Sequence, residues 1–182
     1  MRPSSRGRWD RARGRPGAIS TSLRVPAWCG FCPPWFENLK KRQVKAPKVY
    51  VRDTGLLHTL LGISGESRLL GHPKVGASFE GFVIEQMVSA LEAGDAYYWA
   101  THAGAELDLL VLHAGKRYGF ECKFADAPGT TRSMRVALED LGLDHLWIVY
   151  PGDEGYILDE RITVLPLAEI RTVAKRIAPR SS

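Results

Sequence analysis

Residues 105–124 read AELDLLVLHAGKRYGFECKF and predict a β-hairpin. Polar and apolar side chains alternate along both halves of this stretch, with the period of two that half-buried strands show. Between the halves, residues 113–116 read HAGK and contain a glycine, which a tight turn between antiparallel strands favours. The stretch therefore predicts two adjacent antiparallel strands that carry acidic side chains.

The alternation also assigns side chains to faces. In the first strand Glu106 and Asp108 share one face. The apolar side chains of the same strand share the other face: Leu107, Leu109 and Val111. In the second strand Glu121 and Lys123 share a face. A symmetric turn of either two or four residues gives one register, which sets Asp108 opposite Glu121 and Glu106 opposite Lys123.

Two facing carboxylates repel each other unless a cation lies between them. A divalent metal such as magnesium prefers hard oxygen ligands and suits Asp108 and Glu121. Lys123, beside them, can then orient a water or stabilise negative charge on a phosphate. The alternative is ordinary surface charge, in which Glu106 and Lys123 simply form an ion pair across the hairpin.

A helix is expected over residues 76–93, ahead of the hairpin. With about 100° of rotation per residue, Glu80 falls in the middle of an apolar stripe, whereas Glu85 falls on the polar face. A carboxylate inside an apolar stripe is costly unless it has a partner. Glu80 is therefore expected either in a structural salt bridge or cap, or in a common site with the hairpin acids.

The rest of the pattern completes a mixed α/β domain, with the order helix, three strands, helix, strand. A strand at 48–52 precedes a short helix capped by Asp53 or Thr54, and a glycine-containing loop follows it. Further elements are expected as strands at 97–101, 145–150, 156–158 and 162–165, and as helices from Thr130 or Thr131 to about 141 and at 166–177. The expected sheet is mixed and flanked by helices.

The segment 1–34 reads as a disordered basic tail, which a wrong start or a shifted frame would also explain. Residues 35–47 read as a linker, and the domain is expected at 48–178. Residues 1–48 contain 12 Lys and Arg against 2 Asp and Glu, whereas residues 49–182 contain 13 against 18. Because the folded part is acidic, the basic balance of the whole chain is no argument for nucleic-acid binding.

The cysteines and the hydropathy of the sequence argue against a redox protein, a disulfide-rich or zinc-binding domain, and a membrane or secreted protein. The tail reads WCGFC at residues 28–32, but it lacks the strand and helix that surround a redox Cys-x-x-Cys pair. Three cysteines predict neither a disulfide scaffold nor a zinc site. No apolar run approaches the roughly 18 residues of a membrane span, and no secretory signal is recognisable. The expected location is the cytoplasm, with no membrane partner.

The order of a helix acid, a strand Asp and a Glu-x-Lys strand resembles the core of PD-(D/E)XK, or restriction-endonuclease-like, nucleases. More closely, the chain resembles the C-terminal domain of unknown function 4143 of prokaryotic AAA-type ATP-binding proteins. The stretches that carry this resemblance are PKVYVRDTGLL at 47–57, GASFEGFV at 76–83, AELD at 105–108 and GFECK at 119–123, with PPWFENL at 33–39 resembling the preceding linker.

The resemblance implies roles for individual residues. Glu80, Asp108, Glu121 and Lys123 take the catalytic positions, and Glu106 is a supporting polar residue. Glu80, Asp108 and Glu121 would hold Mg²⁺ or Mn²⁺. The implied function is that of a metal-dependent nuclease acting on nucleic-acid phosphodiesters.

The chain departs from the family pattern because it has no G-x-x-x-x-G-K-[ST] loop, so we expect a fragment without ATPase activity. The alternative function is a non-catalytic module that binds nucleic acid or protein and serves a separate or missing AAA-type ATPase. Candidate partners are therefore nucleic acid and such an ATPase. The sequence does not determine the oligomeric state.

Overall fold

The computed structural model describes residues 27–91 and 96–177, which form a mixed α/β structure. Its elements are β1 (Cys29–Cys32), β2 (Lys48–Val51), α1 (Thr54–Leu60), α2 (Glu66–Leu70), α3 (Val75–Leu91), β3 (Ala96–Ala100), β4 (Glu106–His113), β5 (Lys116–Cys122), α4 (Arg132–Asp140), β6 (His145–Tyr150), β7 (Tyr156–Asp159), β8 (Ile162–Pro166), the 3₁₀ helix η1 (Leu167–Glu169) and α5 (Ile170–Ile177). The predicted order of helix, three strands, helix and strand is confirmed by α3 to β6. The predicted loop between α1 and α3 is wrong in part, because it contains α2.

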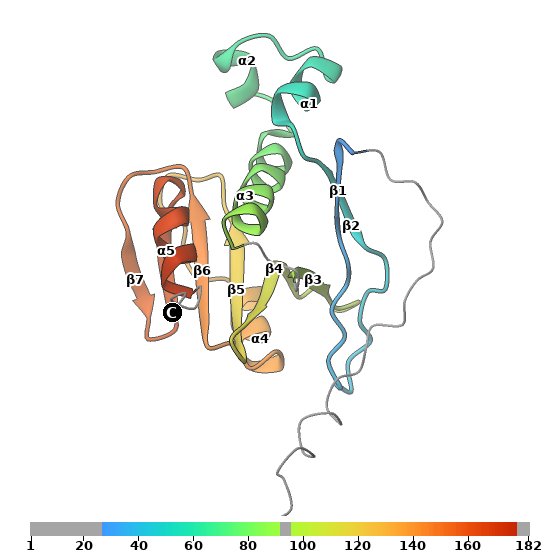
Figure 1. Ribbon diagram of the computed structural model, residues 1–182, viewed down its shortest axis with the longest axis vertical. Coiled ribbons are helices and arrows are strands. Elements are labelled where there is room, and N and C mark those ends of the chain that lie inside the picture. Colours follow the sequence, from blue (N-terminus) through green and yellow to red (C-terminus); the bar gives the residue numbers. More distant parts are fainter. Residues whose placement is uncertain (1–26, 92–95, 178–182) are drawn as a thin grey trace, which may run out of the picture.

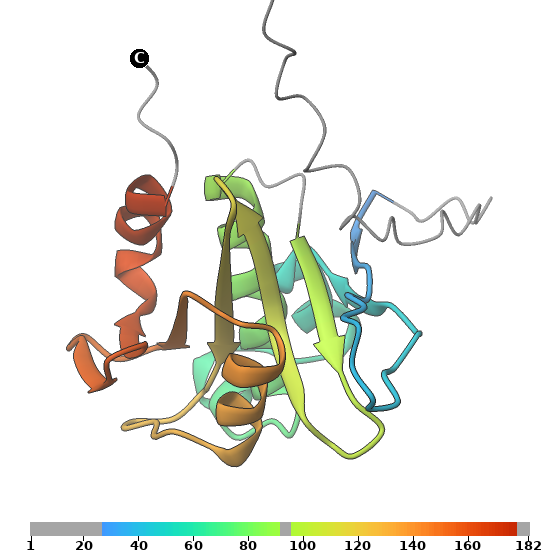
Figure 2. The ribbon, with the colours of Figure 1, turned by 90° about the horizontal axis from the view of Figure 1, so that it is seen from below.

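Six strands form the main sheet in the order β3-β4-β5-β6-β8-β7 (Figure 1). The pairs β5–β6 and β6–β8 are parallel, and the other pairs are antiparallel, so the sheet is mixed. Helices α3 and α5 pack on one face, and α4 covers the other (Figure 2). Each face has its own buried core, which we call the α3-side core and the α4-side core.

The β4–β5 hairpin has a two-residue turn at Ala114 and Gly115, whose φ angles are 50° and 79°. Positive φ at both turn residues is the type I′ conformation that two-residue hairpins prefer. The observed register runs from His113↔Lys116 to Leu109↔Phe120, which confirms the predicted register over these pairs. Asp108 and Glu121 are the next residues along the two strands.

Replacing Ala114 by asparagine is expected to stabilise the protein by about 0.5–1 kcal/mol, because asparagine tolerates the left-handed region better than alanine. Urea or thermal unfolding measures the effect. The corresponding change at the neighbouring position, Gly115→Ala, should destabilise the protein, since it adds a Cβ at a positive φ. An unchanged or lower stability of Ala114→Asn would contradict the assigned turn.

A β-bulge in β4 changes the predicted assignment of faces. Tyr97 pairs with Leu110, but Trp99 pairs with Leu107, so β4 has one extra residue between these two pairs. Past the bulge, Leu107 joins the α4-side core while Leu109 joins the α3-side core. The prediction that Leu107, Leu109 and Val111 share a face is therefore wrong, because an extra residue resets the alternation. Asp108 lies at this irregularity.

The chain before β2 also differs from the expectation of a disordered tail up to residue 34. Cys29–Cys32 form β1, which pairs antiparallel with β2, and the Cys32 side chain is buried in the α3-side core. Composition alone missed this strand because its partner is distant in the sequence. Residues 35–47, predicted as a linker, contribute a bridge from Gln43 to Thr101 at the end of β3. The part of the predicted tail at 1–26 lies outside the described residues.

No helix within residues 27–91 and 96–177 is long and apolar enough to cross a membrane.

Candidate functional site

A lysine ammonium lies among three carboxylates beside the bulge of β4. Lys48 Nζ contacts Glu80 Oε1 and lies 3.0 Å from both Glu106 Oε1 and Asp108 Oδ1. The same ammonium lies over the Tyr98 ring, 4.8 Å from its centroid. We call Glu80, Glu106 and Asp108 the acidic cluster.

Three elements meet at this cluster: β2 supplies Lys48, α3 supplies Glu80, and β4 supplies the other two acids. The sequence placed Glu80 in an apolar stripe and required a partner for it, and the structure shows that partner to be Lys48. Glu85, by contrast, accepts a hydrogen bond of 3.1 Å from the Tyr50 hydroxyl. At the start of β4, Ser133 from α4 hydrogen-bonds both the backbone N–H and the carbonyl of Glu106, so α4 holds this end of the strand.

Asp108 connects the acidic cluster to β5. Its Oδ1 accepts from Lys48, and its Oδ2 accepts a hydrogen bond of 2.9 Å from the backbone N–H of Cys122. Asp108 and Glu121 are both buried, at 6% and 5% exposure. The bulge therefore turns the Asp108 carboxylate toward the end of β5, where the regular pairing of the two strands stops.

Glu121 is the buried acid of the second strand. Its Oε1 lies 2.7 Å from Lys123 Nζ, whereas its Oε2 is buried without a hydrogen-bond partner. Burial raises the pKa of Glu121 to about 7, with a further increase from the Asp108 carboxylate and an opposing decrease from Lys123. Burial, followed by the Asp108 carboxylate, also raises the pKa of Glu80, although Lys48 opposes this.

The two lysines differ in their setting. Burial lowers the pKa of Lys48, but the carboxylates of Asp108 and Glu80 raise it by more, so its ammonium stays charged. Lys123 is more open, with 38% of its side chain exposed against 20% for Lys48. The ion pair between Glu106 and Lys123, which was the alternative interpretation of the hairpin, is not formed here: Glu106 binds Lys48, and Lys123 binds Glu121.

The predicted metal ligands do not form a ready-made metal site. In the described part of the chain, no three or more His, Cys, Asp or Glu side chains are grouped as a metal site requires. The donor chemistry nevertheless fits a hard divalent cation, because all the donors are carboxylate oxygens and one buried oxygen of Glu121 is unpaired. The position between Glu80 and Asp108 is held by the Lys48 ammonium.

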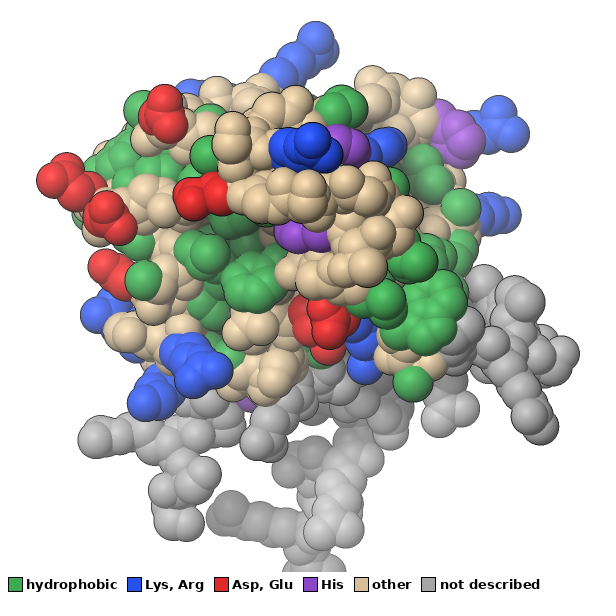
Figure 3. All heavy atoms as spheres, turned by 90° about the horizontal axis from the view of Figure 1, so that it is seen from above, with side chains coloured by type: hydrophobic (Ala, Val, Ile, Leu, Met, Phe, Trp, Pro, Cys, Tyr) green, Lys and Arg blue, Asp and Glu red, His purple; other side chains and the backbone are tan. Residues whose placement is uncertain are grey.

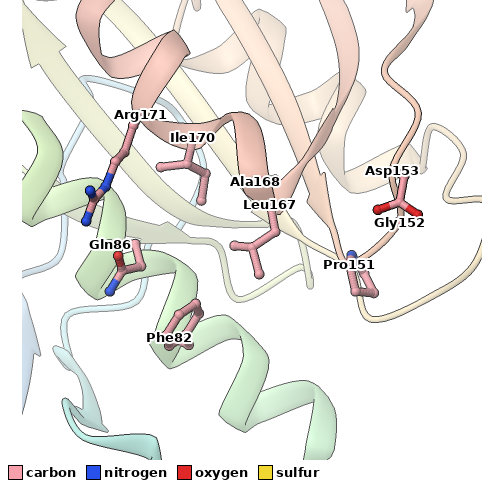
Figure 4. A pocket seen from close by; sticks show the side chains of 9 residues that line it. All are labelled: Phe82, Gln86, Pro151, Gly152, Asp153, Leu167, Ala168, Ile170 and Arg171. Carbon is pink, nitrogen blue, oxygen red and sulfur yellow. The ribbon is translucent and has the colours of Figure 1, made fainter.

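A pocket of about 380 Å³ lies elsewhere, between α3, the loop after β6 and the segment that leads into α5 (Figure 4). Its lining combines Phe82 and Leu167 with polar side chains such as Gln86 and Arg171. None of the acids of the cluster lines it. The pocket is therefore separate from the site that the sequence predicted.

Sequence reasoning missed Lys48 as part of the site. The indirect signal was Glu80, because a carboxylate in an apolar stripe requires a cation or a proton. The chain contains 25 Lys and Arg residues, and no local pattern distinguishes Lys48 from the others. Only the packing of β2 beside α3 identifies it.

Comparisons with known proteins divide the chain into two matched segments. A family model described as a domain of unknown function, DUF4143, matches residues 75–170, which is more than half of the chain. A second domain of unknown function, DUF8612, matches residues 28–67. The three acids of the cluster and Glu121 thus lie in the first match, whereas Lys48 lies in the second.

Two mycobacterial proteins are similar to most of the chain. An uncharacterised protein of Mycobacterium tuberculosis and one of Mycobacterium bovis are each 50% identical to it over 139 residues. The matched region is 76% of this chain but 32% of each relative. The chain therefore spans about a third of the length of these relatives.

Proposed function

Given that the chain belongs to the DUF4143 family, we propose that it is a PD-(D/E)XK, restriction-endonuclease-like domain that cleaves nucleic-acid phosphodiesters with a bound divalent cation. The observation that carries this proposal is the buried, unpaired Oε2 of Glu121 beside the Asp108 carboxylate. A buried carboxylate oxygen without a partner is costly, and a cation ligated there would remove the cost.

The charge balance of the site supports the same proposal. Four carboxylates meet two ammonium groups, which leaves two negative charges uncompensated when all six groups are ionised. Carboxylates this close remain ionised together only when a cation neutralises them. Mg²⁺ or Mn²⁺ brings positive charge to this excess of carboxylates and accepts the oxygen ligands that are present.

Each residue of the site has a separate role in the proposed reaction. Glu80, Asp108 and Glu121 would hold the cation, which when bound activates water and stabilises charge on phosphate. Lys123 is anchored on Glu121 and is partly exposed, so its ammonium can reach a phosphate oxygen. Glu106, the most exposed acid of the cluster, supports the site by pairing with Lys48.

Substrate binding by the folded domain alone is expected to be weak, because residues 49–182 contain 13 Lys and Arg against 18 Asp and Glu. On the face that carries α1 and α2, hydrophobic and other side chains separate the Lys and Arg side chains, and no broad basic patch is visible there among the described residues (Figure 3). Affinity for nucleic acid depends mainly on cations that neutralise phosphates. A second candidate function is a non-catalytic nucleic-acid- or protein-binding module that serves an AAA-type ATPase. It is favoured by the Lys48 ammonium, which already holds the position between Glu80 and Asp108 that a catalytic cation would take.

Wild-type protein is expected to bind Mn²⁺ in a saturable manner, and Glu80→Gln is expected to weaken this binding about tenfold or more, because it removes a charged ligand. Isothermal titration calorimetry measures both affinities. Glu85→Gln is the matched control, since Glu85 lies on the same helix but contacts Tyr50 instead of the cluster.

Absence of saturable Mn²⁺ and Mg²⁺ binding to wild-type protein would overturn the proposed function. Binding without cleavage of labelled single- or double-stranded DNA and RNA would replace it by the module. A loss of affinity in Glu85→Gln equal to that in Glu80→Gln would show that the cation binds outside the acidic cluster.

A further inference from the structure

We propose that Lys48 and a divalent cation are alternative occupants of the acidic cluster, so that the β1–β2 segment controls whether the site holds metal. This inference rests on the proposed function and concerns the regulation of the same site. Its starting observation is that the Lys48 ammonium contacts all three acids of the cluster: Glu80, Glu106 and Asp108.

The ammonium already occupies the space that a cation needs. Its contacts with Glu106 and Asp108 are 3.0 Å, whereas magnesium binds carboxylate oxygens at about 2.0–2.1 Å. A metal ion on Glu80 and Asp108 would therefore lie next to the ammonium with both charges positive. Like charges at such distances repel strongly in a partly buried site, so one of the two must leave.

Lys48 remains charged in this setting. A lysine loses its proton only near pH 10 in water, and three neighbouring carboxylates favour the charged form further. Other titratable side chains that face it are Cys32, which lies opposite Lys48 in the β1–β2 pair, and Tyr98, whose ring lies under the ammonium. Displacement of Lys48 therefore requires movement of the side chain or of its strand.

The strand that carries Lys48 lies outside the main sheet and is attached to the α3-side core through side chains, including Cys32 of β1. β2 pairs with β1 in a two-stranded sheet outside the main sheet (Figure 1). Two-stranded sheets are marginally stable on their own, so β2 depends on side-chain contacts such as the hydrogen bond from Tyr50 to Glu85 on α3. The Lys48 side chain also borders solvent, at 20% exposure, which gives its flexible stem a route outward.

The lysine and the acids of this site lie in two segments that match different family models. Lys48 lies in the segment that matches one family model, and the acids lie in the segment that matches another. A partner domain or substrate that displaces β1–β2 would withdraw the ammonium and leave three carboxylates uncompensated. The cluster would then bind a divalent cation more tightly.

The test uses Lys48→Met, which approximates the length of the side chain and removes its charge. In EDTA this variant is expected to melt below the wild type, because the three acids then repel one another without a counter-ion. Its affinity for Mn²⁺ is expected to be at least about tenfold tighter than that of the wild type, and saturating Mn²⁺ should raise its melting temperature by more. Calorimetric titration and thermal unfolding of the full chain measure these quantities.

Two further lysine variants serve as controls. Lys48→Arg keeps the charge and should bind Mn²⁺ no more tightly than the wild type. Lys41→Met removes a lysine whose partner is Asp140, which is not an acid of the cluster, and should leave the Mn²⁺ affinity unchanged. If Lys48→Met does not fold in EDTA, recovery of the fold in Mn²⁺ supports the proposal, and Lys48→Gln, which keeps a hydrogen-bond donor, provides the affinity.

Equal or weaker Mn²⁺ binding by Lys48→Met than by the wild type would overturn this inference alone, provided that Glu80→Gln still loses affinity. No binding by the wild type, Lys48→Met or Lys48→Gln would overturn the proposed function and this inference together. Tight Mn²⁺ binding by Lys48→Met together with weaker but saturable binding by the wild type would support the inference most directly.

Discussion

Asp108→Asn is expected to reduce divalent-cation-dependent cleavage of nucleic acid by about 100-fold or more. Asp108 connects the acidic cluster to β5. One of its oxygens binds Lys48, and the other accepts a hydrogen bond from the backbone N–H of Cys122. Asparagine retains an acceptor for the Cys122 N–H but removes the charge that a cation requires. Losses of about 100-fold or more are usual when a charged group that stabilises a reacting phosphate or its metal is neutralised.

The measurement is the single-turnover cleavage rate in Mn²⁺ on labelled DNA and RNA. Asp140→Asn is the matched control, because Asp140 pairs with Lys41 and not with the lysine of the acidic cluster. Both variants should unfold at temperatures near that of the wild type. A cleavage rate of Asp108→Asn within threefold of the wild-type rate would show that Asp108 has no role in the reaction.

Glu121→Gln is expected to stabilise the metal-free protein by up to about 3 kcal/mol at about pH 8, because it removes a buried charge. Burial, with help from Asp108, raises the pKa of Glu121 from 4.5 to about 7, so the folded state binds a proton more tightly than the unfolded state. A shift of one pKa unit corresponds to about 1.4 kcal/mol. Above pH 7 the folded protein therefore carries the full cost of an ionised Glu121, and the neutral glutamine avoids it.

The same shift fixes the pH dependence. As the pH falls from above 7 toward 4.5, folded Glu121 takes up its proton while the unfolded carboxyl is still ionised, so the wild type gains stability relative to Glu121→Gln. Below about pH 4.5 both states are protonated, and the difference between the two proteins should disappear. Urea unfolding in EDTA across this pH range measures it.

Glu139→Gln is the control for the pH series, since Glu139 lies exposed on α4. Its stability should follow that of the wild type at every pH. A Glu121→Gln variant that is less stable than wild type at the alkaline end of the series would mean that the Lys123 ion pair outweighs the cost of burying the carboxylate.

Local patterns in the sequence predicted much of the fold because their physical causes are local. The apolar stripe around Glu80 depends only on helical geometry, and the start that it predicted for α3 lies next to the observed start at Val75. The side chain of Thr131 accepts from the Met134 backbone, which begins α4 where a cap was expected. The HAGK turn set the β4–β5 register because a two-residue turn and alternation together leave one choice.

Three features of the site depended on contacts between distant segments. The bulge at Asp108 is a property of the β3–β4 pair, so alternation within β4 alone could not reveal it. β1 exists because β2 pairs with it, and its own composition is typical of a loop. Which positively charged side chain lies among the acids depended on tertiary packing. This packing brings Lys48 beside Glu80 and Asp108, which follow much later in the chain.

The physical reason for this division lies in how each preference arises. Helical stripes, caps and tight turns are favoured by side chains within a few residues of one another, so the chain carries their full signal. A buried charge specifies only that a counter-charge is needed, and any of 25 Lys and Arg residues satisfies that requirement until the chain has folded. The amino-acid sequence by itself thus determined that Glu80 and Asp108 each need a counter-charge, and the tertiary packing of β2 against α3 and β4 determined that the Lys48 ammonium supplies it and also binds Glu106.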